Sequence, residues 1–341
     1  MSLARAEPRW WPELWPLHSR SVRDRIRRGA FDVYHFTSAE ASVGAIDIKT
    51  IATVYDLIPL QSGLGKSLDP RQRWRAALYR RYLRNLRAAN RLIAISVATA
   101  NALAVELRIP RERIDVIPLG IDAAEWRRRA QGETAALRTR HALPERFWLS
   151  VTSPNANKGW PDLVHGLANA RASGLKIPMV IAGYWMADQR RDLTTLARTL
   201  GVADLVHFLG YVEDDVLPAL YAQALGFIFA SRREGFGLPV LEAMAAGTPL
   251  IVADEPAVLE LANGMAEVFP GGEAAGLVFP RGEAAGLVFP RGEPASLAER
   301  MVQLAGDAAM RTRLAGQGLK RSAEYSWERT VDQTLKVYDA L

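Results

Sequence analysis

Two kinds of segment alternate along most of this chain. Short unbroken apolar runs, such as residues 225–230 and 249–253, are typical of parallel strands that are covered on both faces. Between them lie longer segments, some of which begin at a capping residue such as Ser96 or Ser326, and these predict helices. The pattern predicts strands at residues 32–36, 50–57, 91–95, 114–119, 147–152, 177–183, 206–209, 225–230 and 249–253, and helices at 70–89, 96–108, 188–200, 214–224 and 326–341. This alternation is typical of an α/β protein with doubly wound parallel sheets.

The length of 341 residues allows two such sheets, each with its own core. Residues 123–145 are charged and lack a strong core pattern, so we expect them to connect a first domain, residues 1–122, to a second, residues 146–323. One ten-residue sequence, EAAGLVFPRG, occurs twice without change, at 273–282 and 283–292. Two copies of so short a unit cannot build a solenoid, so we expect one strand there and a surplus copy that forms a loop or a poorly ordered strand.

The segment around residues 225–254 carries the strongest sign of a ligand site. Gly235 and Gly237 follow a predicted strand and allow backbone shapes that a Cβ would obstruct. Pro239 falls early in the next helix and Gly247 ends it. The result is a group of backbone N–H donors at a helix N-terminus, which suits a phosphate or the polar edge of a sugar.

Two carboxylates, Glu234 and Glu242, frame that turn. Glu234 ends the strand and Glu242 lies about two turns along the helix, so the two can hold different parts of one ligand. A glycoside hydrolase with Glu234 and Glu242 as its paired acids is disfavoured, because the helix separates them by about 10 Å along one axis.

The string REGFGLPVLEAMAAGTPLIV at residues 233–252 resembles the donor-site motif of the family-four retaining glycosyltransferases, which have the GT-B fold. The first half of the chain resembles the same family at DVYHFTS, TIATVYDLIPL, ANRLIAISVATANAL and IDVIPLGID. The resemblance implies two Rossmann-like, doubly wound domains that face each other across a cleft. It also implies that residues 324–341 form a last helix that packs back on the first domain.

The resemblance implies roles for several residues of the second domain. Glu234 would face the hydroxyls of the donor sugar, and Glu242 would bind the ribose. The amides that would approach the sugar and the diphosphate belong to Gly235, Phe236, Gly237 and Leu238.

Further positions of the motif would hold the diphosphate and the base. Lys158 would hold the diphosphate, and Ser153 stands where relatives carry an Arg or Thr, so one cationic contact is expected to be missing. Gly183 would bring the backbone close to the nucleotide, and Tyr211 would lie beside the base.

The acceptor side departs from the family pattern at two places. Tyr55, followed by Asp56, stands where many relatives carry His, and a tyrosine can donate a hydrogen bond but cannot act as a base near neutral pH. Nothing before Asp32 resembles the family's opening strand and glycine-rich loop, so we expect the first domain to be shortened. A non-catalytic protein that binds nucleotide sugars or glycans therefore stays open as the alternative function.

The reaction implied is the transfer of a hexose from a nucleotide-diphosphate sugar, GDP-mannose or another, to a hydroxyl of a glycan or lipid-linked acceptor, with the anomeric configuration retained. No cofactor besides the donor is expected. The acids Glu213, Asp214 and Asp215 suggest helix capping rather than a metal site. A Rossmann dehydrogenase is disfavoured, because no G-x-G-x-x-G follows a strand.

Composition describes a globular protein with 49% apolar and 23% charged residues, no cysteine and a net charge of +6. No apolar run approaches the length of a membrane span and no signal peptide is evident, so we expect a cytoplasmic protein. Much of the positive charge lies at residues 71–91, where Trp74, Leu78, Tyr82 and Leu86 recur on one helix face. The arginines on the other faces indicate either a solvated surface or a peripheral contact with anionic lipid at the inner membrane surface, and no nucleic-acid motif is present.

Overall fold

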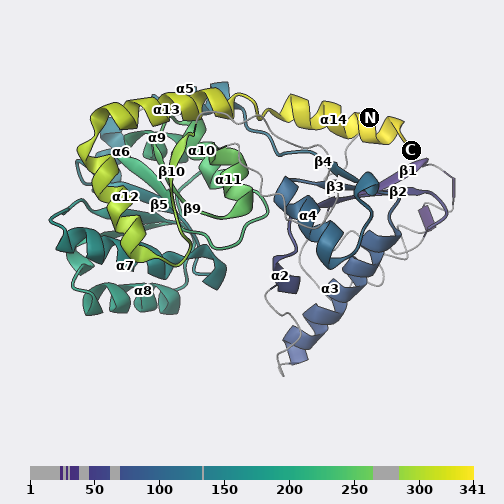
Figure 1. The fold of residues 1–341 in the computed structure, drawn as a ribbon, viewed down its shortest axis with the longest axis horizontal. Helices are drawn as coiled ribbons and strands as arrows, with labels where there is room; N and C mark the ends of the chain where they lie inside the picture. Colours follow the sequence, from purple (N-terminus) through teal and green to yellow (C-terminus); the bar gives the residue numbers. More distant parts are fainter. Residues whose placement is uncertain are drawn as a thin grey trace.

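The computed structural model describes residues 24–25, 28–29, 31–37, 46–61, 70–132, 134–263 and 284–341. Two lobes lie side by side, and each is built around a parallel sheet with helices packed against it (Figure 1). The predicted fold class is confirmed. Each of the nine predicted strands is present, although most are a residue or two shorter than their apolar runs.

The first lobe contains a four-stranded parallel sheet in the order β1-β2-β3-β4. Its strands are β1 (Val33–Phe36), β2 (Lys49–Val54), β3 (Arg91–Ala94) and β4 (Ile114–Val116), and its helices are α2 (Ile58–Gln61), α3 (Pro70–Ala88) and α4 (Val97–Glu106). The prediction that Ser96 caps a helix is confirmed, because its side chain accepts a hydrogen bond from the backbone N–H of Thr99 at 3.0 Å.

Helix α3 packs on the first sheet through only part of its predicted apolar face. Tyr82, Leu83 and Leu86 are buried in the core of this lobe. Trp74 was expected on the same face, but its side chain is 45% exposed. The reason is geometric: the beginning of α3 extends beyond the edge of the sheet, so the sheet does not bury Trp74, although Ala76 beside it is buried (Figure 1).

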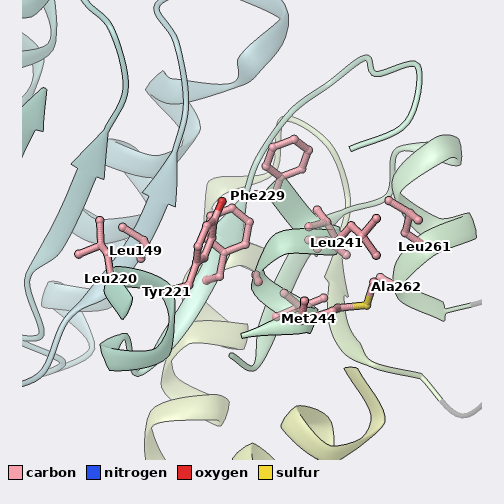
Figure 2. Close-up of a cluster of buried hydrophobic side chains, with 14 of the residues drawn as sticks. Leu149, Leu220, Tyr221, Phe229, Leu241, Met244, Leu261 and Ala262 are labelled. Atoms are coloured by element: carbon pink, nitrogen blue, oxygen red, sulfur yellow. The ribbon is translucent and has the colours of Figure 1, made fainter. Parts of the chain in front are cut away.

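The second lobe contains a six-stranded parallel sheet in the order β10-β9-β8-β5-β6-β7. Its strands are β5 (Trp148–Val151), β6 (Met179–Ala182), β7 (Val206–Gly210), β8 (Gly226–Phe229), β9 (Leu250–Ala253) and β10 (Gly286–Phe289). Its helices are α7 (Trp160–Ala172), α8 (Ala187–Thr199), α9 (Leu217–Gln223), α10 (Leu238–Ala245), α11 (Pro256–Asn263), α12 (Pro294–Gly306) and α13 (Ala308–Ser322). Apolar clusters fill both faces of this sheet. Figure 2 shows part of one of them, which includes Tyr221 of α9, Phe229 of β8, and Leu241 and Met244 of α10.

The strand order places a topological switch point between β5 and β8. The chain runs from β5 outward through β6 and β7, then returns to the other side of β5 and continues through β8, β9 and β10. Loops that follow β5 and β8 therefore leave the sheet in opposite directions. In open α/β sheets this is where ligands bind, outside the carboxyl ends of the strands.

The predicted connection at residues 123–145 contains two helices, α5 (Ala123–Ala130) and α6 (Thr134–His141). Both pack against α9 of the second lobe, where Leu137 and Leu143 are buried and Trp126 lies 6.4 Å from the ring of Tyr221. The many arginines of this segment interrupt the helical period that its few core residues would otherwise show.

The last helix, α14 (Trp327–Asp339), leaves the second lobe and lies along the first (Figure 1). Val337 packs in a cluster with Ile51, Ile93 and Ile117 of the first sheet. The Tyr338 hydroxyl lies 2.6 Å from His35 Nδ1. The chain thus crosses between the lobes at two places, once before α5 and once before α14.

The second copy of the repeat supplies β10, which pairs in parallel with β9. Helix α12 follows it and begins at Pro294. The first copy, at 273–282, lies outside the described residues.

Candidate active site

Four of the predicted site residues follow four neighbouring strands of the second sheet. Lys158 lies in a short 3-10 turn (Ala156–Lys158) after β5, and Glu234 lies in the loop after β8. Gly183 follows β6 and Tyr211 follows β7. Because all these strands are parallel, the four positions lie at the carboxyl edge of one sheet.

Lys158 and Glu234 form an ion pair across the switch point. Lys158 Nζ lies 2.7 Å from Glu234 Oε1, and the side chains are 26% and 10% exposed, respectively. Both groups are thus partly withdrawn from water but accessible from one side. Such a pair offers a cation to a diphosphate and a carboxylate to sugar hydroxyls within one small space.

The two loops are joined just before these charged residues. The Asn157 side chain donates to the carbonyl of Arg233 at 3.1 Å, and the Asn157 carbonyl accepts from the backbone N–H of Arg232 at 2.7 Å. The Arg232 guanidinium pairs with both carboxylate oxygens of Asp162, which is buried in the first turn of α7. These contacts fix where Lys158 and Glu234 can point.

The loop from Gly235 to Leu238 presents backbone amides at the start of α10. Gly237 has a φ of +106°, a left-handed conformation that favours glycine, and among the described residues no side chain caps this helix. Phe236 is buried against the ring of Tyr325 at 6.1 Å, whereas Leu238 is 39% exposed. The first N–H groups of α10 therefore have no side-chain partner, as at the helix N-termini that bind anions.

Glu242 lies on α10 and points into the lobe rather than into open solvent. It accepts a hydrogen bond from the hydroxyl of the fully buried Tyr221 at 2.9 Å. Burial raises the pKa of the Glu242 carboxyl, and the bond from Tyr221 opposes that rise. The Glu242 and Glu234 carboxylates thus have different partners and different environments.

The predicted residues for the base and the diphosphate lie on the neighbouring loops. Gly183 has a φ of +140°, and its N–H donates to the carbonyl of Gly210 at 2.7 Å, so the ends of β6 and β7 are held together. Tyr211 is 67% exposed beside them, as an unpacked aromatic ring that a planar base could cover. Ser153 is half-buried in the loop after β5.

Tyr55 and Asp56 lie in the first lobe, at the point where that lobe touches the second. The strand was expected to continue to residue 57, but β2 ends at Val54, because Asp56 turns the chain by accepting from the backbone N–H of Ile58 at 2.9 Å. Gly235 packs so closely on the Tyr55 carbonyl that any Cβ at Gly235 would overlap it. The Tyr55 side chain is 43% exposed.

Sequence reasoning missed residues that support this site. Glu255 is buried just after β9 and accepts from the backbone N–H of Val258 at 3.0 Å, and the backbone N–H groups of Val258 and Glu234 both act to lower the pKa of its carboxyl. Burial raises the pKa of Glu255 to about 7. Because Glu255 follows a predicted strand, the sequence pattern could have identified it as a candidate site residue. No sequence pattern indicates that Tyr221 bonds to Glu242.

The acids at residues 213–215 were predicted to begin a helix, but α9 begins at Leu217 and the acids lie in the turn before it. Glu213 pairs loosely with Arg140, at 3.7 Å. Among the described residues, no cluster of three or more His, Asp or Glu side chains has an arrangement that could hold a metal ion.

Two models of known protein families match this chain. A family model described as glycosyl transferases group 1 matches residues 135–321, and one described as glycosyltransferase family 4 matches residues 3–125. The chain belongs to the glycosyl transferases group 1 family. The second match includes residues 3–31, where the sequence pattern alone indicated no likeness to the family. Family membership sets aside the dehydrogenase and hydrolase alternatives.

Two curated relatives are mannosyltransferases by name. The chain is 27% identical to the MMP alpha-(1->4)-mannosyltransferase of Mycolicibacterium hassiacum over 92% of its own length and 71% of the relative's. It is 31% identical to the serotype-specific mannosyltransferase WbdA of Escherichia coli over 62% of its own length, but over only 26% of that longer protein.

Among solved structures, HepE of Anabaena in complex with UDP superposes with a TM-score of 0.74, covering 97% of this chain and 85% of HepE at 20% identity. This likeness shows the fold of the family, GT-B, with two parallel-sheet domains. No described helix combines the length and the apolar character that crossing a bilayer requires.

Proposed function

We propose that this protein transfers a hexose from a nucleotide-diphosphate sugar to a hydroxyl group, and that the donor binds at the carboxyl edge of the second sheet. The observation that carries the proposal is the ion pair between Lys158 and Glu234 at 2.7 Å, located at the switch point beside the amides that open α10. The acceptor hydroxyl would enter from the first lobe, past Tyr55 and Asp56.

Charge balance explains what each group does. As the sugar–phosphate bond breaks, negative charge grows on the diphosphate, and the Lys158 ammonium and the amides of residues 235–238 stabilise it. Glu234 holds the hydroxyls of the sugar, and Glu242, kept in place by Tyr221, holds the ribose. Tyr211 covers the base, while Ser153 and the backbone at Gly183 line the diphosphate.

The stereochemistry proposed is retention of the anomeric configuration. No side-chain nucleophile is needed if the acceptor approaches the face that the diphosphate leaves, because a phosphate oxygen then accepts the acceptor's proton. Proton NMR of the first product formed distinguishes an axial from an equatorial anomeric proton. Appearance of the opposite anomer before any equilibration would contradict this part of the proposal.

GDP-mannose is the first donor to try, since the two relatives named above are mannosyltransferases. We would incubate the purified chain with GDP-mannose, UDP-glucose, UDP-N-acetylglucosamine and dTDP-rhamnose and measure the nucleoside diphosphate released. Release from one donor, unaffected by EDTA and lost in Glu234→Ala, is the expected result. Binding without release would favour the alternative function of a non-catalytic nucleotide-sugar or glycan-binding protein.

The acceptor proposed is a glycan or a lipid-linked glycan reached at an anionic membrane surface. On α3, the side chains of Arg73, Arg80 and Arg84 are exposed along the helix, and the 45% exposed Trp74 lies near its beginning. A basic helix face with an exposed indole suits the headgroup region of anionic lipid.

The membrane contact has its own test. Co-sedimentation with phosphatidylglycerol vesicles should be lost in the Arg80→Glu/Arg84→Glu variant, whereas Arg191→Glu/Arg198→Glu, at two exposed positions on α8, serves as a charge-matched control. Equal binding to neutral phosphatidylcholine vesicles, or no effect of the double substitution, would contradict the contact.

A further inference from the structure

The junction between the lobes contains a buried carboxylate that bonds across it. Helix α11 of the second lobe faces the beginning of α4 of the first (Figure 1). Glu260 Oε2 accepts from the backbone N–H of Val97 at 2.9 Å, and Oε1 accepts from that of Ala98 at 2.6 Å. Only 7% of Glu260 is exposed, so its carboxylate depends on these N–H groups rather than on water for hydrogen bonds.

The carboxylate completes the capping of α4. The first N–H groups of a helix have no partner within the helix and attract negative charge. Ser96 of the same lobe satisfies the N–H of Thr99, and Glu260 of the other lobe satisfies those of Val97 and Ala98. The beginning of α4 is thus held partly by its own chain and partly by the opposite lobe.

This end of α4 reaches both sides of the candidate active site. The Thr99 hydroxyl lies 3.3 Å from the carbonyl oxygen of Tyr55 and 3.3 Å from that of Gly235. Its single proton can be shared between the two acceptors. One residue of α4 therefore joins the acceptor-side segment to the donor-side loop that follows Glu234.

Glu260 is itself firmly held. The buried Arg321 guanidinium donates to the carbonyl of Glu260 at 2.7 Å and to that of Leu261 at 2.8 Å, and lies 3.2 Å from the Tyr325 hydroxyl. Arg321 belongs to α13 and holds the backbone of α11 at Glu260. Movement of α4 relative to the second lobe would therefore have to break the bonds from α4 to the Glu260 carboxylate.

We propose that Glu260 is a positioning residue, which caps α4 across the lobe junction and thereby sets the separation between Tyr55 and the Gly235 loop. The inference rests on the proposed function only for what that separation serves, namely the approach of acceptor to donor. All the residues proposed to hold the donor lie in the second lobe. Glu260 therefore acts on turnover and on the geometry of the lobes, but not on nucleotide affinity.

The geometric test uses the natural absence of cysteine. Spin labels at Val105→Cys, which is 68% exposed on α4, and at the exposed Thr199→Cys on α8 report the distance between the lobes. We expect one narrow distance distribution in the otherwise unmodified chain. In Glu260→Ala its mean distance should increase and its width should grow at least about twofold, while Glu260→Gln, which keeps one acceptor oxygen, should give intermediate values. Glu299→Ala, an exposed control on α12, should leave the distribution unchanged.

The functional test separates this inference from the proposed function. In Glu260→Ala, calorimetry should give unchanged affinity for UDP and GDP, while donor turnover falls by about tenfold or more. No turnover of any donor by the unmodified chain would count against the proposed function, and the label distances would still decide the role of Glu260.

An unchanged, narrow distance distribution in Glu260→Ala would overturn the inference. So would a loss of nucleotide affinity as large as the loss of turnover. If Glu260→Ala does not fold, Thr99→Val decides, because it removes the other half of the connection. We expect it to broaden the distances, and no change would overturn the inference.

Discussion

Lys158 and Glu234 come from loops on opposite sides of the switch point, yet their charged atoms lie 2.7 Å apart. Neither residue has another ion-pair partner among the described residues. A diphosphate that binds here must share Lys158 with Glu234 or replace it, so the ion pair and the donor compete for the same cation. This competition gives the two residues opposite mutational effects.

Substitution Glu234→Gln should separate nucleotide binding from transfer. The neutral amide no longer competes for Lys158, so we expect equal or up to about tenfold tighter binding of free UDP or GDP, because charge-assisted hydrogen bonds are strong. Transfer should fall by about a hundredfold or more, since a charged group that grips the sugar is lost. Calorimetry and initial rates measure the two effects, and weaker nucleotide binding together with normal turnover would contradict the assignment.

Substitution Lys158→Ala should weaken binding of the free nucleoside diphosphate by about tenfold. The lysine is 26% exposed, so solvent screening keeps the loss moderate. Lys176→Ala, at an exposed position, is the matched control. Equal effects of the two substitutions would show that Lys158 is an ordinary surface lysine.

Substitution Tyr221→Phe should leave the Glu242 carboxyl without its hydrogen-bond donor. The hydroxyl bond lowers the pKa of Glu242 against the effect of burial, so its loss should raise that pKa further. We expect the free energy of unfolding to fall by about 1–3 kcal/mol. Urea denaturation measures this, and Tyr184→Phe, at a ring that is 74% exposed, should have no comparable effect.

Glu255 and Glu260 give stability a defined dependence on pH. The pKa of each is raised to about 7, mainly by burial; for Glu255, the backbone N–H groups of Val258 and Glu234 oppose this rise, the Glu234 carboxylate adds to it, and the Arg291 guanidinium opposes it. For Glu260, Glu255 raises the pKa and Arg321 and the α4 amides lower it. A raised folded-state pKa means that protonation favours the fold, so this stability is fully present below the ordinary value and lost as pH rises through about 7.

The measurement is the difference in free energy of unfolding between the unmodified chain and Glu260→Gln, followed from pH 5 to pH 8. Because glutamine does not titrate, the unmodified chain should lose stability relative to the variant as pH rises, by on the order of a few kcal/mol. A difference that is constant over this range, or that grows in the other direction, would contradict the predicted titration.

The sequence predicts the positions of residues that lie at the ends of strands. Glu234, Gly183 and Tyr211 each follow an apolar run, and parallel strands bring such ends to one edge. Their approximate place in the fold therefore followed from pattern alone. The roles of these residues in binding came from the resemblance to the family and stay predictions.

Contacts between elements that are far apart in the chain could not be predicted from the sequence. The bond from Glu260 to α4 joins residues more than 160 positions apart and depends on how the two lobes meet. The sequence pattern of residues 123–145 predicts no helix, because core residues such as Leu137 and Leu143 are too few to form a visible period among the arginines. Trp74 shared the helical spacing of a core residue, but α3 extends beyond the sheet that would have buried it.

The most direct test of the donor site is a crystal structure of the chain soaked with the sugar nucleotide that supports turnover. The diphosphate should lie within hydrogen-bonding distance of Lys158 Nζ and of the amides of residues 235–238, with the sugar hydroxyls on Glu234. A nucleotide bound elsewhere, with the pair of Lys158 and Glu234 intact and unoccupied, would contradict the proposed site.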